Sequence, residues 1–184
     1  MLNYKEKLVQ LNQYRIYVRD YPGKEPAIIL MHGFPDNLHL YDRLVPFLSP
    51  PQRVIVFYFL GWGASDKPAG YPYTATNQRL ELDAVVKQLQ LGRVVLVAHD
   101  ASGEPAIDWA LAHPEQVAGL VLLNTNYGTM PTLRPPEAIW LFSTPLVRNI
   151  ARWVSQMFGA WLFRRMYRWQ VHPRSRLSAP RPLR

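Results

Sequence analysis

The sequence predicts an α/β protein built on a doubly wound, mostly parallel sheet. Four apolar runs have the length of buried strands, and helical patterns lie between them. Strands that alternate with helices pair in parallel and carry helices on both faces of the sheet. The 184 residues fit one domain, and an apolar content of 48% is enough to build its core.

The elements follow in order along the chain. An antiparallel hairpin is expected first, because KEKLVQL and YRIYVRD alternate apolar and polar residues on either side of Asn12-Gln13. Four buried strands are predicted within AIILMHG (27–33), RVIVFYFLGWG (53–63), RVVLVAHD (93–100) and VAGLVLLNTN (117–126). Helical patterns cover about 38–48, 76–91 and 101–113.

The chain changes character after Asn126, which divides it into three regions. Residues 1–126 carry all the predicted strands. Residues 127–170 begin with the linker-like YGTMPTLRPPE and continue as aromatic-rich helices. Residues 171–184 hold three prolines and four arginines without a periodic apolar face, and we expect an irregular basic tail there.

The net charge of +8 comes entirely from the last quarter of the chain. Residues 138–184 contain nine arginines and no acidic residue, whereas residues 1–137 contain 12 basic and 13 acidic residues. A basic tail attracts polyanions without specificity. No nucleic-acid-binding motif accompanies it, so we expect no nucleic-acid partner.

The composition favours a cytoplasmic protein. There is no cysteine, which excludes disulfides and cysteine metal sites. The first ten residues, MLNYKEKLVQ, lack the apolar run of a signal peptide, and no run of about 18 uncharged apolar residues predicts a transmembrane helix. We expect no cofactor, no metal and no stable membrane insertion.

The turn after the third buried strand, AHDASG (98–103), is the strongest candidate for a catalytic centre. A nucleophile on a sharp strand-to-helix turn needs small neighbours, because the helix packs closely against the strand. With Asp100 at the apex, Ala98, Ser102 and Gly103 satisfy this requirement. With Ser102 at the apex, the bulky Asp100 and Glu104 would occupy those positions, so Ser102 is the poorer candidate. The alternative is that Asp100 only caps the following helix.

A second turn, LMHGFPDN (30–37), predicts an oxyanion hole beside this elbow. Such a hole needs two backbone N–H groups aimed at one point. The expected donors are Ala101, which follows the nucleophile, and Phe34 in the second turn. Gly33 allows this turn to be tight, and Pro35 stiffens it.

Three motifs, HGFPDN, GWGASDKP (61–68) and AHDASG, resemble those of the α/β-hydrolase fold family, in its epoxide hydrolase and haloalkane dehalogenase-like branch. The resemblance covers residues from about 5 to 171. It implies an incomplete hydrolase core over 1–126, a partial helical cap over 127–170, and a small apolar substrate of the epoxide or alkyl halide type. It also implies that Asp100 attacks carbon to form an alkyl ester, which a histidine-activated water then hydrolyses.

The residues for that second step are missing. In the family the histidine follows the last strand, and here only His172 comes late enough, within the irregular tail. Some relatives carry the acid at the position of Asn124. We therefore expect a C-terminally truncated hydrolase that does not turn over, with a frameshift as one hypothesis for residues 171–184.

The resemblance also assigns supporting roles and marks two departures. His32 and His99 are expected to shape the site by hydrogen bonding, and Tyr167 is a candidate hydrogen-bond donor to the opening oxygen of an epoxide. Tyr58 stands where the family usually has aspartate, with consequences for loop geometry. Ala101 stands where many relatives have a tryptophan that holds the leaving halide, which leaves epoxide and halide chemistry both open.

Two further hypotheses belong to other functional classes. One is a non-catalytic interaction protein, in which the strand within 117–126 exposes an unpaired apolar edge and self-associates. The other is association with a membrane surface through the Arg- and Trp-rich segment 148–169.

Overall fold

The computed structural model describes residues 3–128 and Trp161. The chain divides into two compact units, Met1–Met130 and Pro131–Arg184. All the elements described below belong to the first unit. The predictions for the cap helices and the basic tail, including Tyr167 and His172, lie outside the described residues.

The chain begins with the predicted hairpin. Strands β1 (Lys5–Leu11) and β2 (Tyr14–Tyr21) pair in antiparallel register, with Val9 opposite Ile16. Asn12 turns the chain with a φ of 53°, a left-handed conformation that asparagine tolerates better than most residues.

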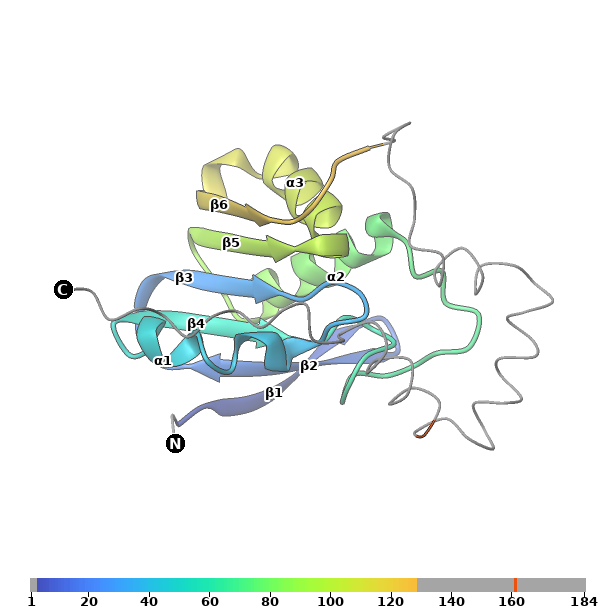
Figure 1. The fold of residues 1–184 in the computed structure, drawn as a ribbon, viewed down its shortest axis with the longest axis horizontal. Coiled ribbons are helices and arrows are strands. Elements are labelled where there is room, and N and C mark those ends of the chain that lie inside the picture. The colour runs from blue at the N-terminus through green and yellow to red at the C-terminus, as the bar shows by residue number, and fades with distance from the viewer. Residues whose placement is uncertain (1–2, 129–160, 162–184) are drawn as a thin grey trace. The chain divides into compact units, whose positions relative to one another are not determined.

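The four predicted buried strands form the rest of one six-stranded sheet, as Figure 1 shows. They are β3 (Lys24–Met31), β4 (Gln52–Phe57), β5 (Val94–His99) and β6 (Val117–Leu123). The strand order is β1-β2-β4-β3-β5-β6, and β4, β3, β5 and β6 run parallel. The prediction of a mostly parallel α/β sheet is confirmed.

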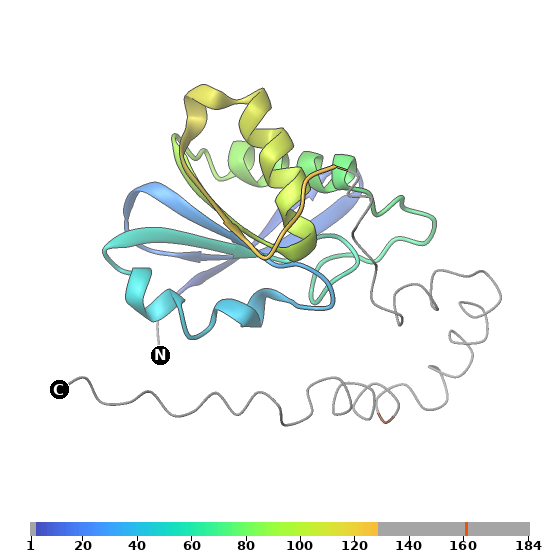
Figure 2. The ribbon, with the colours of Figure 1, turned by 45° about the horizontal axis from the view of Figure 1, so that its top comes forward.

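Helices cover both faces of this sheet, as Figure 2 shows. On one face lie the helices α2 (Ala75–Gln88) and α3 (Gly103–Ala112). On the other face lie two one-turn helices, the 3-10 helix η1 (Leu38–Tyr41) and the α-helix α1 (Val45–Leu48). Successive strand residues point to opposite faces. Ile29 accordingly packs with the α2 and α3 side chains, and Leu30 with those of η1 and α1. Burial on both faces explains why the central strands are continuous apolar runs.

Two predicted boundaries are wrong. The helix expected at about 38–48 is broken into η1 and α1, because Pro46 lacks an N–H and its ring would clash with the carbonyl four residues earlier in a continuous helix. The strand expected within 53–63 ends at Phe57. The apolar residues that follow, Tyr58 to Leu60, are buried in a loop, so their composition reflects burial and not pairing.

The parallel strands bring four loops to one edge of the sheet. The chain leaves β3, β4, β5 and β6 at their carboxyl ends, into residues 32–37, 58–74, 100–102 and 124–128. In open α/β sheets this edge is where ligands bind.

Candidate active site

Asp100 sits at the sharp turn between β5 and the helical segment η2 (Asp100–Ser102) that leads into α3. Its φ is 54°, which places a non-glycine residue in the left-handed region. Such residues occur where the surrounding structure enforces them, and they concentrate at functional sites. The local geometry is a sharp strand-to-helix turn, the kind of turn that a nucleophile elbow requires, and it is called the elbow below.

Small residues let other backbone segments approach this elbow. A Cβ added at Gly33 would collide with the side chain of Asp100 and lie 2.7 Å from the His99 carbonyl oxygen. A Cβ at Gly103 would collide with the side chain of Thr125. Gly103, one of the positions at which the sequence pattern requires a small residue, is therefore a position of close contact, and so is Gly33 in the loop after β3.

Ser102 holds the elbow through hydrogen bonds to the backbone. Its side chain is buried, and its Oγ accepts a hydrogen bond from the His99 N–H at 2.9 Å. The same Oγ lies within donor distance of two carbonyl oxygens, those of Met31 at 3.0 Å and His99 at 2.9 Å. Ser102, the weaker of the two nucleophile candidates, thus links the end of β5 to the end of β3 by hydrogen bonds.

The loop after β3 carries the expected oxyanion donor. Gly33 is packed against Asp100, which places the next residue, Phe34, beside the elbow. The Phe34 side chain is half-exposed, and its ring meets that of Trp62 edge-on at 6.5 Å between centroids. Ala101 lies at the start of a helical segment, where backbone N–H groups have no partner within the helix.

His32 is buried and ties two loops together. Its Nδ1 hydrogen bonds to the Gly33 carbonyl oxygen at 2.9 Å, and its Nε2 accepts from the Phe59 N–H at 3.3 Å. These partners fix the neutral form with the proton on Nδ1. Burial lowers the pKa of His32, which keeps the ring in that form. An imidazole with both nitrogens engaged is not free to activate water.

The contacts of the other described histidines are made with residues other than Asp100. The Nδ1 of His99 lies 3.5 Å from Asp36 Oδ2. His39 pairs with Asp42 at 2.7 Å, and the ring of His113 stacks on Trp109 at 4.7 Å between centroids. Within residues 3–128 we therefore find no histidine placed as the base for ester hydrolysis.

Thr125 is a site residue that the sequence reasoning missed. It follows β6, and its Oγ1 donates a 2.6 Å hydrogen bond to the Asp100 carbonyl oxygen. This bond fixes the backbone of the elbow from the side opposite to Ser102. The sequence feature that could have indicated Thr125 was its position directly after a predicted parallel strand, because the carboxyl ends of neighbouring parallel strands meet at one edge of the sheet.

Glu81 is a second missed residue, buried within α2. Its Oε2 accepts from the Leu60 N–H at 2.7 Å, and its Oε1 accepts from the Tyr71 hydroxyl at 3.0 Å. Burial raises the pKa of Glu81 to about 7, although both hydrogen bonds act in the opposite direction. Glu81 thereby anchors the loop that contains GWGASDKP, close to Trp62.

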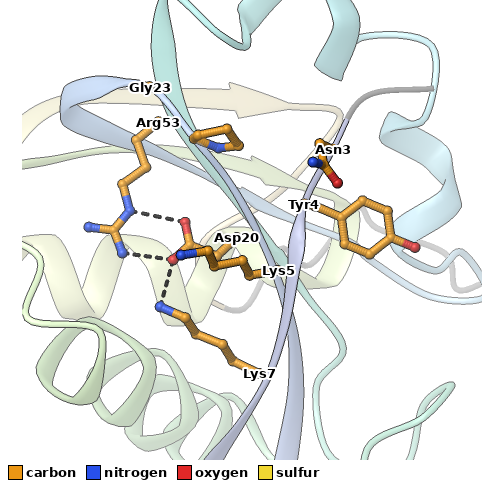
Figure 3. A pocket seen from close by; sticks show the side chains of 8 residues that line it. Asn3, Tyr4, Lys5, Lys7, Asp20, Gly23 and Arg53 are labelled. Atoms are coloured by element: carbon orange, nitrogen blue, oxygen red, sulfur yellow. Dashed lines mark hydrogen bonds and ion pairs between the residues drawn. The ribbon is translucent and has the colours of Figure 1, made fainter.

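One surface hollow among the described residues lies away from this chemistry. It has a volume of about 420 Å³ and opens at the amino ends of β1 and β4, where Figure 3 shows Lys7 and Arg53 converging on Asp20. The Lys7 Nζ lies 2.8 Å and the Arg53 Nη2 lies 2.9 Å from Asp20 Oδ2. Burial would raise the pKa of Asp20, but the hydrogen bonds from Arg53 and Lys7 outweigh it and hold the pKa below its ordinary value. This carboxylate is a structural ion-pair centre.

Among the described residues, no group of three or more His, Asp or Glu side chains is arranged to hold a metal ion. No helix within these residues has the length and apolarity needed to cross a membrane.

The family model described as alpha/beta hydrolase fold matches residues 26–158. A cis-3-alkyl-4-alkyloxetan-2-one decarboxylase from Shewanella oneidensis is 30% identical over 155 residues, which are 82% of this chain and 48% of that protein. A haloalkane dehalogenase from Sphingobium indicum is 34% identical over 131 residues, 69% of this chain and 43% of that protein. The chain spans about half the length of these relatives.

A solved structure gives the same fold. The epoxide hydrolase VrEH1 from Vigna radiata superposes with a TM-score of 0.70 at 21% identity, over 89% of this chain and 57% of that one. At this identity the likeness concerns the fold of the sheet and its helices.

Proposed function

The chain belongs to the α/β-hydrolase fold family, and from that premise we propose that it attacks electrophilic carbon through the Asp100 carboxylate. The substrates we propose are small and apolar, of the haloalkane or epoxide type. Relatives named for haloalkane and oxetanone chemistry support this class.

One observation carries the proposal: an aspartate occupies the apex of the elbow with a φ of 54°. A carboxylate that only capped a helix would not need a left-handed backbone or the close approach of Gly33. The strain of this conformation is maintained by the hydrogen bonds from Ser102 and Thr125 to the surrounding backbone.

The proposed first step needs no base. An aspartate is ordinarily ionised at neutral pH, and the helix that begins behind Asp100 favours its negative charge. One carboxylate oxygen forms a bond to the substrate carbon while the carbon–halogen bond breaks and the halide leaves with the electron pair. With an epoxide, the ring carbon–oxygen bond breaks and the oxygen takes a proton from water. Either reaction leaves an alkyl ester on Asp100.

Hydrolysis of this ester is the step that the described residues do not support. It requires a base to remove a proton from water, with the N–H groups of Phe34 and Ala101 stabilising the oxyanion. Both ring nitrogens of His32 are hydrogen bonded, and the Nδ1 of His99 lies 3.5 Å from Asp36 Oδ2. We therefore propose that the chain accumulates the ester.

Intact-mass measurement after incubation with 1-bromobutane or 1,2-epoxybutane tests this proposal. We expect one adduct per chain, which peptide mapping places on Asp100. In the Asp100→Asn variant the labelling rate should fall to the background of surface carboxylates, because the amide is a poor nucleophile. Asp108→Asn, which changes another aspartate on α3, should label like the wild type. Labelling that is independent of Asp100 would disprove the proposal, and multiple turnovers would disprove the stalled second step.

A non-catalytic interaction protein is the second candidate, and β6 favours it. Within the described residues β6 pairs only with β5, and the four side chains from Leu120 to Leu123 are each between 37% and 44% exposed. An exposed apolar edge strand is a template for pairing with another chain. Size-exclusion chromatography separates the two candidates: an assembly that persists in Asp100→Asn, without any labelling of Asp100 in the wild type, favours interaction.

A further inference from the structure

The two proposed oxyanion donors lie on separate loops, so their mutual position depends on contacts between those loops. The root of the loop after β3 is well fixed. The Met31 carbonyl oxygen accepts a hydrogen bond from the Tyr41 hydroxyl at 2.7 Å, and Ser102 Oγ lies 3.0 Å from the same oxygen. Gly33 is in contact with Asp100. The Gly33–Phe34 peptide itself is held by the hydrogen bond between His32 Nδ1 and the Gly33 carbonyl oxygen. These contacts all act at or before that peptide, and they leave the chain beyond Phe34 to be held by something else.

Asp36 supplies that contact from beyond Phe34. Its Oδ2 lies 3.5 Å from the Nδ1 of His99, the residue directly before Asp100. The Nδ1 atom is buried and makes no hydrogen bond, the one such side-chain atom in the described part of the chain. A buried polar atom without a partner is rare and calls for an explanation.

The Asp36 carboxylate approaches this buried atom although the Asp36 side chain is 41% exposed. Its charge acts on two buried neighbours. After burial, it is the other cause that raises the pKa of Tyr41, and it opposes the burial that lowers the pKa of His32. The carboxylate thus lies close to the inner face of the loop, on the side of the elbow.

We propose that Asp36 is a positioning residue, which clamps to His99 and so holds the loop beyond Phe34, in addition to the His32 hydrogen bond, in the position that directs the Phe34 N–H toward Asp100. This rests on the proposed function, because the clamp matters to chemistry only if Asp100 carries the ester. His99 is joined through Asp100 to Ala101, so the clamp links the loop of one donor to the loop of the other. A separation of 3.5 Å is longer than a good hydrogen bond, and catalytic contacts of this kind commonly shorten when the site is occupied.

The carbonyl stretch of the Asp100 ester measures this positioning directly. Hydrogen bonds from the oxyanion donors lower the stretching frequency of the ester carbonyl. The band is isolated by subtracting infrared spectra of chains with ordinary and with carboxyl-13C aspartate, both labelled with 1-bromobutane. In Asp36→Asn we expect the frequency difference between folded and urea-unfolded ester to shrink by about half, because one of two donors is lost.

Asp42→Asn is the matched control. Asp42 is also a half-exposed aspartate beside a histidine, but it pairs with His39 and Arg19 and not with the elbow. It should leave the ester band unchanged. The His99→Gln variant should shift the band like Asp36→Asn, and the double variant should add nothing further. An unchanged band in Asp36→Asn, or an equal shift in Asp42→Asn, would overturn the clamp.

A second readout keeps the clamp testable if no ester forms. The 1H–15N spectrum of the protein is recorded before any reaction with 1-bromobutane. The chemical shift of the Phe34 backbone amide should change in Asp36→Asn and in His99→Gln, and should be unchanged in Asp42→Asn. If the Phe34 amide chemical shift is unchanged in Asp36→Asn, the positioning role of Asp36 is overturned. Absence of ester with a responsive Phe34 resonance instead overturns the proposed chemistry and retains the clamp.

Discussion

A methyl group added at Gly33 has no free space, because it would lie 2.7 Å from the His99 carbonyl oxygen and closer still to Asp100. We expect Gly33→Ala to lower the free energy of unfolding by about 1–3 kcal/mol, the usual effect of overpacking a rigid contact. It should also slow the labelling of Asp100. The control is Gly92→Ala, where a Cβ meets nothing within 4 Å. Urea unfolding of both variants checks the prediction, and an equal loss at Gly92 would contradict it.

Glu81 makes a testable contribution to stability as a function of pH. Its pKa rises from 4.5 in the unfolded chain to about 7 in the fold. Between these values the folded state binds more protons, so stability falls as pH rises through this window. In Glu81→Gln this fall should disappear. Between pH 4.5 and pH 8 the free energy of unfolding of the variant should therefore gain about 3 kcal/mol relative to that of the wild type.

Urea unfolding across this pH range measures the effect of Glu81. Glu104→Gln serves as the control, because Glu104 is an exposed residue of α3. It should leave the pH profile of stability parallel to that of the wild type. A parallel profile for Glu81→Gln as well would show that the buried carboxyl is not linked to folding.

Strand β6 combines an uncharged apolar sequence with exposure at the edge of the sheet. If this edge pairs with a second copy, a charge on it opposes pairing. We expect Leu122→Lys to weaken self-association by about tenfold or more, equivalent to about 1.4 kcal/mol. Leu111→Lys is the control, because Leu111 is 69% exposed on α3 and lies on no strand edge. Analytical ultracentrifugation measures both, and an equal effect would point to general charge repulsion.

The elements also show what the sequence could and could not predict. Buried strands were recognisable because burial on both faces leaves a continuous apolar run, and the elbow because close packing demands small residues. The break between η1 and α1 was missed although Pro46 was visible, because helical periodicity persisted across it. The roles of Glu81, Thr125 and the Asp36–His99 pair were not predictable, since each depends on contacts between distant segments.

Within the described part of the molecule, the candidate active site and the main cluster of ion pairs around Asp20 lie at opposite ends of the sheet. The loops after β3, β5 and β6 bring Asp100 and its supporting residues to the carboxyl edge, whereas the ion pairs of Asp20 lie at the amino ends of β1 and β4. This chain covers about half of the length of its relatives, and that half contains the elbow and both proposed oxyanion donors. The base for the second step is a separate requirement, which the described part of the fold does not meet.

The two outer strands of the sheet differ in a way that limits stoichiometry. β1 carries Lys5, Glu6 and Lys7, and charges of this kind discourage strand addition. β6 carries none. If β6 pairs with a second copy as proposed, it can do so only with the β6 of that copy, across a two-fold axis. Such pairing would occupy the β6 edge of both partners, so strand addition to this sheet would stop at two chains.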